Sequence, residues 1–396
     1  MPITENLTAA LGAEGLEDPT LALGLEGVAD WSPQMAFLDQ MKSSRPFFSN
    51  GYSNEDLIAG GYLDENGWPT EIPPGGGVAG TFFAWGDFQS GPAHAGVYVL
   101  DYEGEGIIDR PGGTIMSSEP GRITFQSNGS NFGLNILSTD PSGTGDYIRD
   151  ISIVAEEHYA LYEAGAVFNP DWLEVIQDTR QVRYMDWQNT NESSASEWGD
   201  RIGPDHASWV EYDGVPVEIL VQLANEIGAD PWFNIPHLAT DEYIREFASY
   251  VRDNLDPRLK ASFEFSNETW NYSFQHTHDL NQAGRDEWGA DSWGGYYVKQ
   301  AVNMAQSLDE VYGSEADARL VKVLGAFGSV PWLTEQYLES TDWFEHEPDT
   351  AVRAADVFDA VAVTTYFGYS VTGEHRVYQR DIASPLRDRE DSTAMD

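Results

Sequence analysis

Apolar and polar residues follow three different patterns along the chain. Residues 50–80 are rich in Gly and Pro and carry no lasting periodicity, which predicts an irregular connection. Between residues 96 and 154, short β-rich runs alternate with Gly, Pro, Asn and Asp, which predicts a compact antiparallel β module. From about residue 168, helical spacing alternates with short apolar runs. That alternation is typical of repeated β-α-β units.

The second half of the chain carries clear helix signals. Asn169 is a favoured N-cap, and Pro170 suits the first helical position, so a helix is predicted over 170–179. Apolar side chains at helical spacing predict a helix over 216–227 that ends at Gly228, and Thr240 begins another. A further long helix is expected over 296–312. Ser32 and Pro33 predict an earlier helix that reaches residue 42.

Six short apolar runs are predicted to be parallel strands, near residues 47, 184, 233, 263, 323 and 362. A closed (β/α)8 TIM-type barrel needs eight strands, and residues 369–396 are too few and too polar for two more units. We therefore expect an α/β fold of this type, truncated after its sixth strand, with the antiparallel module inserted after the first. An open doubly wound sheet is the alternative, but no Gly-rich phosphate loop follows any strand.

The patterns also suggest a division of the chain. Residues 1–31 are expected to be a loose leader, and 32–80 to hold the first helix, the first barrel strand and the connection. Residues 81–155 would form the sandwich-like module and 156–370 the barrel, followed by a polar tail over 371–396.

Charge narrows the range of partners. The chain has 66 acidic residues against 21 basic ones, for a net charge of −45, so neither nucleic acid nor an anionic membrane is an expected partner. Such a surface suggests a halophilic protein from a saline habitat, where salt screens its self-repulsion. There is no Cys, which excludes disulfides and thiolate metal sites. No apolar run is long enough to span a membrane, and residues 1–30 lack the features of a signal peptide.

One strand carries the candidate chemistry. In residues 261–268, alternation places Glu264, Ser266 and Glu268 on one face and Phe263 and Phe265 on the other. Barrel enzymes place their sites at the carboxyl ends of the strands. The polar and aromatic side chains at or after the ends of the predicted strands are Arg183, Asp186, Trp187, Asn234, His237, Asn267, Glu268, Trp270 and Tyr366.

Two segments resemble known proteins. Asn267-Glu268 at the end of a fourth strand resembles the Asn-Glu acid/base pair of the retaining (β/α)8 glycoside hydrolases that include cellulases and mannanases. Together with the run Pro231-Trp232-Phe233-Asn234-Ile235-Pro236-His237, the stretch from Glu264 to Asn271 is similar to bacterial secreted proteins labelled cellulose-binding. The similarity runs through roughly residues 30–370.

The resemblance implies roles for these residues. Glu268 would be the general acid/base, and Asn267 would hydrogen-bond the sugar 2-hydroxyl. Arg183 would orient the nucleophile, Tyr366 would hydrogen-bond to it, and His237 would line the subsite at the reacting sugar. The nucleophile itself is a Glu after a seventh strand in that clan, and it stays unknown here because Glu374 lies in a loop after the sixth.

Structural interpretations of the same residues remain open. Glu264 suits a buried partner of Arg183, which would place it behind the site rather than in it. Trp187, Trp232 and Trp270 suit either a core or a sugar platform, because 13 Trp residues fit both.

No metal or other cofactor is expected. The run from His276 to Asp279 could ligate a divalent ion, but the spacing suggests no further ligand. In the β module, Asn128, Asn131, Asp140 and Asp146 could bind Ca²⁺, as could many acidic loops.

The sequence therefore predicts a glycoside hydrolase-like protein that acts on a neutral polysaccharide or oligosaccharide by retaining hydrolysis. The expectation is of an extracellular monomer, inactive if the nucleophile is missing. The alternative is a non-catalytic carbohydrate-binding protein on the same scaffold. A third hypothesis is a scaffold within a larger surface protein.

Overall fold

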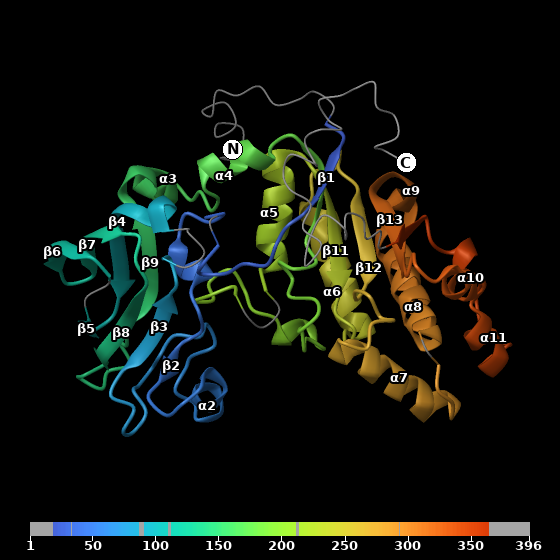
Figure 1. The fold of residues 1–396 in the computed structure, drawn as a ribbon, viewed down its shortest axis with the longest axis horizontal. Coiled ribbons are helices and arrows are strands. Elements are labelled where there is room, and N and C mark those ends of the chain that lie inside the picture. Colours follow the sequence, from blue (N-terminus) through green and yellow to red (C-terminus); the bar gives the residue numbers. More distant parts are fainter. Residues whose placement is uncertain are drawn as a thin grey trace, which may run out of the picture.

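A six-stranded parallel sheet and two antiparallel sheets make up the protein (Figure 1). The computed structural model describes residues 19–32, 34–86, 91–109, 112–210, 214–292 and 294–363. In the parallel sheet the order follows the sequence: β1 (Leu21–Gly24), β10 (Thr179–Arg183), β11 (Asp230–Ile235), β12 (Ala261–Phe265), β13 (Leu320–Ala326) and β14 (Ala360–Val363). The sheet curls into a half-barrel, so the expected α/β fold with parallel strands is confirmed at this coarse level.

Helices lie between the strands of the parallel sheet along the chain. They are α4 (Pro170–Ile176), α5 (Val217–Ile227), α6 (Asp241–Asn254), α7 (Gln275–Trp288), α8 (Gly295–Tyr312), α9 (Ala316–Arg319), α10 (Pro331–Glu339) and α11 (Thr341–His346). The expected caps are confirmed: Asn169 accepts from the Asp171 amide, Thr240 accepts from the Tyr243 amide, and Gly228 ends α5 at φ 68°. Within the described ranges, no helix combines the length and apolar character needed to cross a membrane.

One face of the parallel sheet packs on these helices. Val182, Phe233 and Phe263 alternate with polar residues along their strands and are fully buried. The Phe233 ring lies 5.5 Å from Phe263 and 5.3 Å from Phe247 of α6. The opposite side chains therefore face the concave side of the half-barrel, where the candidate site lies.

The β module is two four-stranded antiparallel sheets. One has the order β2 (Phe48–Ser49), β3 (Ala79–Phe83), β8 (Phe132–Thr139), β5 (Gly106–Ile108); the other has β6 (Thr114–Glu119), β7 (Arg122–Asn128), β4 (Ala95–Glu103), β9 (Arg149–Ala155). A single core joins the two sheets. In it, Phe83 stacks on Phe132 and Tyr98 stacks on Phe125. Helix α2 (Asn54–Ala59) and α3 (Tyr159–Glu163) flank the module.

The first parallel strand is not the expected one. Phe48–Ser49 pairs antiparallel with β3, so the strand expected near residue 47 belongs to the module. The first strand of the half-barrel is Leu21–Gly24, which pairs with β10 inside the segment expected to be a loose leader. This strand has only four residues, and Leu21 is 56% exposed, so little of it enters the core.

The first helix is also different from the prediction. Residues 34–39 are not helical, and only a 3-10 turn, η1 (Gln40–Ser43), forms. Asp39 caps this turn through the Met41 amide and also accepts from the Ile153 amide of β9, so tertiary contacts replace the expected helix.

Candidate functional site

Three neighbouring strands bring a cation, an amide and a carboxylate to the concave face. Asn234 of β11 is in register with Glu264 of β12, and Arg183 ends β10 next to Trp232 of β11. Because paired residues of parallel strands point to the same side, these side chains converge.

One oxygen of Glu264 holds this cluster together. Its Oε2 accepts from Arg183 Nη2 at 2.8 Å, from Trp232 Nε1 at 3.1 Å and from Asn234 Nδ2 at 3.1 Å. The guanidinium also lies 5.0 Å from the centre of the Trp232 ring. Glu264 is only 3% exposed, so its charge is balanced inside the protein rather than by solvent.

The neighbouring strand β13 is shaped around the same carboxylate. A Cβ atom at Gly325 would lie 2.7 Å from Glu264 Oε1, so a larger residue does not fit there. The Gly325 amide donates to the Tyr297 hydroxyl at 2.9 Å. Burial, reinforced by the charge of Glu264, holds the pKa of Tyr297 well above its usual range. Sequence reasoning missed both residues, although a glycine inside an apolar strand was a usable signal.

The turn after β12 has an unusual backbone. Ser266 and Glu268 have φ angles of 57° and 41°, a region that non-glycine residues rarely adopt. Asn234 Nδ2 donates to the Ser266 carbonyl at 2.7 Å and helps to fix the turn. Such conformations cluster at functional sites, where the surrounding structure holds them in place.

This turn links Asn267 and Glu268 to the cluster in different ways. Asn267 accepts from Arg183 Nη2 at 3.1 Å and donates to Asn191 Oδ1 at 3.0 Å, so its amide is held on both sides. Glu268 is half-buried, and its Oε2 accepts from Asn271 Nδ2 at 3.0 Å. Glu268 is therefore more accessible than Glu264.

Two histidines lie beside the turn. His237 Nε2 is 3.0 Å from Asp279 Oδ2, and the His237 and His276 rings are 5.8 Å apart. Burial lowers the pKa of His276 to about 4, with His237 acting in the same direction. Burial also lowers the pKa of His237, although Asp279 opposes the shift. Both imidazoles are therefore neutral at pH 7.

The same geometry bears on the metal hypothesis. His276 is buried, whereas His278 is exposed and contacts the Tyr272 carbonyl at 2.9 Å. In the described part of the chain, no group of three His, Cys, Asp or Glu side chains could hold a metal ion.

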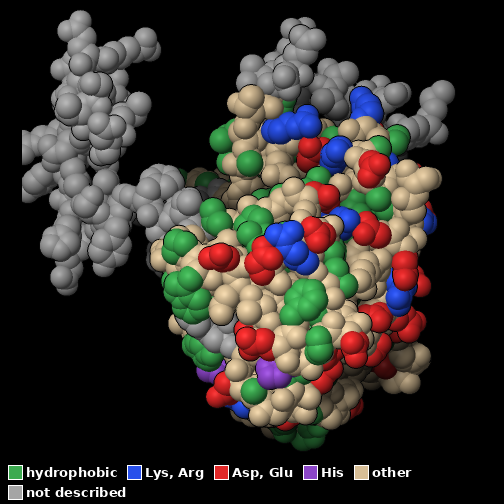
Figure 2. Space-filling model, turned by 90° about the vertical axis from the view of Figure 1, so that its right-hand side faces the viewer, with side chains coloured by type: hydrophobic (Ala, Val, Ile, Leu, Met, Phe, Trp, Pro, Cys, Tyr) green, Lys and Arg blue, Asp and Glu red, His purple; other side chains and the backbone are tan. Residues whose placement is uncertain are grey.

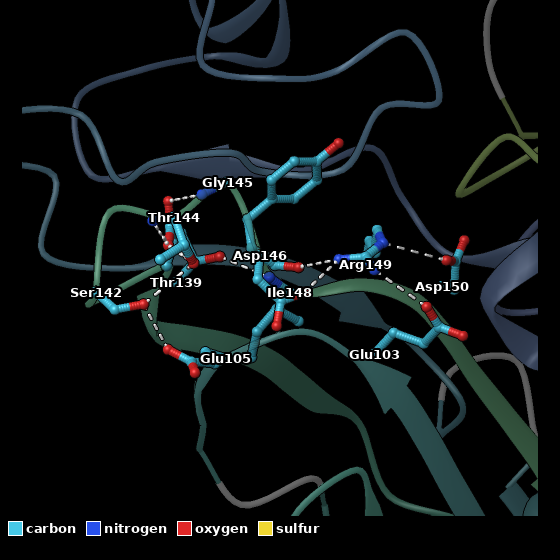
Figure 3. Close-up of polar contacts among 12 residues, drawn as sticks. Glu103, Glu105, Thr139, Ser142, Thr144, Gly145, Asp146, Ile148, Arg149 and Asp150 are labelled. Atoms are coloured by element: carbon cyan, nitrogen blue, oxygen red, sulfur yellow. Dashed lines mark hydrogen bonds and ion pairs between the residues drawn. The ribbon is translucent and has the colours of Figure 1, made fainter.

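In the acidic loop of the β module, the carboxylates bind groups of the loop itself (Figure 3). Asp140 accepts from the Thr144 and Gly145 amides, each at 2.8 Å, and these bonds lower the pKa of its carboxyl group. Asp146 pairs with Arg149 at 3.0 Å. These contacts give the carboxylates a structural role in closing the loop.

The expected aromatic residues occupy different positions. Trp187 is 1% exposed and stacks on Trp172 at 5.6 Å, so it belongs to the core. Trp270 is also buried and stacks on Phe327 at 5.6 Å. Trp232 is half-buried beside Arg183, and Asp186 is exposed. Tyr366 and Glu374 lie outside the described residues.

The structure thus brings together Arg183, Asn234, Glu264 and Asn267, with Trp232, and sets Glu268 and His237 on adjoining segments. Comparisons give no further guide: no protein-family model, curated protein or solved structure matches the chain.

Proposed function

We propose that the protein is glycoside hydrolase-like, on a (β/α)8-type barrel scaffold, and acts on a neutral polysaccharide by retaining hydrolysis. The observation that carries the proposal is the turn after β12. There, Asn267 is anchored by Arg183 while Glu268 stays partly accessible at a strained backbone position. An immobilised amide beside an accessible carboxyl group suits sugar binding with general acid/base catalysis.

Each residue has a defined part in this proposal. Glu268 protonates the glycosidic oxygen and then activates water, and Asn267 binds the 2-hydroxyl of the sugar. Glu264 does not react. It pairs with Arg183, whose Nη2 also donates to Asn267, and it so holds the Asn267 amide in place. His237 and Trp232 line the sugar site from β11 and the residues after it.

The nucleophile is not assigned. Retaining hydrolysis needs a second carboxyl group about 5 Å from the first. The described sheet has six strands, and the resemblance places the nucleophile after a seventh. The second candidate function is a carbohydrate-binding protein without hydrolytic activity, which needs the sugar site but no nucleophile.

The two functions are separated by assays on the whole protein. We would incubate it with β-glucans, mannans, xylans and galactans and measure released reducing sugar. Glu268→Gln should lose at least a hundredfold on these substrates and less on aryl glycosides with good leaving groups, which need little protonation. Equal rates for Glu268→Gln and wild type would remove Glu268 from the mechanism. Binding without any release would favour the carbohydrate-binding function.

The acidic surface is consistent with a neutral substrate. Acidic side chains spread over much of the face shown in Figure 2, most densely toward its right-hand edge. Together with the net charge of −45, they would repel a polyanionic glycan.

A further inference from the structure

The loop after β10 brings another amide to the candidate site. Gln188 is 6% exposed and binds the backbone of β11 twice: its Nε2 donates to the Asn234 carbonyl at 3.1 Å, and its Oε1 accepts from the Asn234 amide at 2.8 Å. Further along this loop, Asn191 Oδ1 accepts from Asn267 Nδ2 at 3.0 Å. Because Gln188 fixes the loop on β11, Asn191 lies at the carboxyl end of the sheet, beside the turn after β12.

Hydrogen-bond polarity fixes the orientation of both amides. A guanidinium group only donates, so the contact from Arg183 Nη2 at 3.1 Å requires the Asn267 oxygen on that side. Asn267 Nδ2 therefore faces Asn191, which must present its oxygen in return because two amino groups do not bind each other. The Asn191 Nδ2, with its two N–H groups, is left on the side away from Asn267.

Asn191 is the accessible end of this series of amides. Asn267 is only 6% exposed, and both its oxygen and its amino group are already engaged. Asn191 is half-buried, its Nδ2 is not an enclosed atom, and no described residue supplies an acceptor for that atom. Solvent or a ligand therefore reaches these N–H groups, and a ligand that binds there has to present an acceptor.

The order of the groups matches the order of the oxygens on a sugar ring. Asn267 contacts Asn191, from the β10 side, and directly precedes Glu268, whose Oε2 accepts from Asn271 of the same turn. A sugar carries its glycosidic oxygen on carbon 1 and hydroxyl groups on carbons 2 and 3. With the glycosidic oxygen at Glu268 and the 2-hydroxyl at Asn267, the 3-hydroxyl comes to Asn191.

We propose that Asn191 is a substrate-binding residue of the half-barrel site and donates a hydrogen bond to the 3-hydroxyl oxygen of the sugar beside Glu268. The inference rests on the proposed function for the presence of a sugar, but it needs no nucleophile and no hydrolysis. Asn191 also holds Asn267 in place, so the test has to separate direct contact with the sugar from that positioning.

Calorimetry on the whole protein tests the contact. The probes are the methyl glycosides of glucose, mannose, galactose and xylose, followed by the 2-deoxy and 3-deoxy analogues of the one that binds most tightly. Asn191→Ala should weaken binding of the parent glycoside about fivefold to tenfold, because one hydrogen bond is lost. Wild type should lose a similar factor with the 3-deoxy analogue, whereas Asn191→Ala should bind that analogue and the parent equally.

A purely structural role gives a different pattern. If Asn191 only held Asn267, the loss in Asn191→Ala would disappear with the 2-deoxy analogue instead. Asn191→Asp is the second variant, because it keeps an oxygen for Asn267 and removes the donor. It should bind the 3-deoxy-3-fluoro analogue, whose fluorine accepts but does not donate, about fivefold more weakly than wild type does, and it tests the contact if Asn191→Ala does not fold.

The matched control is Asn225→Ala, at the opposite end of the sheet. Asn225 is also half-buried, and its side chain donates to the Asn254 carbonyl at 2.9 Å and accepts from the Asp256 amide at 2.7 Å. These residues precede β11 and β12, so the control lies at the amino ends of the strands. Asn225→Ala should leave every affinity unchanged.

The outcomes separate this inference from the proposed function. A loss in Asn191→Ala that depends on the 3-hydroxyl supports the contact even if no polysaccharide is hydrolysed. Equal affinities of wild type and Asn191→Ala for the parent glycoside, or a loss that depends on the 2-hydroxyl, would overturn the contact and leave the proposed function standing. A wild type that neither binds nor hydrolyses any of the sugars would overturn both.

Discussion

Replacing Glu264 with Gln should destabilise the half-barrel far more than removing a surface charge. The Glu264 carboxylate is 3% exposed and takes three hydrogen bonds on one oxygen, from Arg183, Trp232 and Asn234. Glutamine keeps the shape and one acceptor oxygen but loses the negative charge. Arg183 would then be left without a carboxylate in a largely enclosed site.

The magnitude follows from the burial of the two partners. Breaking a fully buried ion pair costs about 3 to 5 kcal/mol, because the remaining charge is uncompensated. The Arg183 side chain is 26% exposed, so water compensates it in part. A hydrogen bond to a charged group contributes roughly 1.5 to 3 kcal/mol. Together these give an expected loss of about 2 to 3 kcal/mol in the free energy of unfolding.

Urea denaturation at pH 7, followed by circular dichroism, measures this loss. The matched control is Glu310→Gln, which removes the same charge from an exposed pair with Arg245, where the side chains are 67% and 44% exposed. That change should cost under about 1 kcal/mol. Adding Arg183→Met to Glu264→Gln should recover part of the loss, since the unpaired charge disappears. Equal losses for Glu264→Gln and Glu310→Gln would refute the reasoning.

Three other perturbations test separate features. Burial raises the pKa of Glu226 to about 7 from 4.5, so its contribution is fully present below pH 4.5 and is lost as pH rises to about 7. Glu226→Gln should therefore exceed wild type at pH 8 by about 1 to 2 kcal/mol, after allowance for its partial exposure, with no advantage at pH 4. Trp187→Ala should cost about 3 to 5 kcal/mol in unfolding free energy, because it empties a core position, and should leave sugar affinity unchanged in calorimetry. With a net charge of −45, raising NaCl from 0.1 to 2 M should increase the urea midpoint, and a flat series would reject the saline-habitat hypothesis.

Local signals predicted the regular elements of the second half well. Asn169 and Thr240 cap helices because their short side chains reach the first free amides, and that reach depends only on neighbouring residues. The alternation of Glu264 with Phe263 and Phe265 likewise gave the two faces of β12. Both signals act within a few residues, which is the range that a single sequence expresses.

The position of the first parallel strand was predicted wrongly, because that strand depends on contacts between distant segments. Leu21–Gly24 becomes a strand only because it pairs with β10, far along the chain. Its residues are mostly exposed, and the alternation of Leu21 and Leu23 over four residues is too short to mark a strand. Phe47 and Phe48 looked more strand-like, but they serve the module core and its edge. Pairing between distant segments decided both cases.

Burial depth explains what the sequence left open about the two glutamates. They share a strand face four residues apart, so alternation treats them alike. Gly325 leaves room for the Glu264 carboxylate, and three donors then occupy its Oε2. The chain turns at Ser266, whose positive φ no sequence pattern predicts. Glu268 therefore lies beyond the end of the strand and is half-buried. A carboxylate held by three donors suits fixing an arginine, whereas a half-buried one can exchange a proton with a ligand. This difference is why the proposed acid/base is Glu268 and the positioning residue is Glu264.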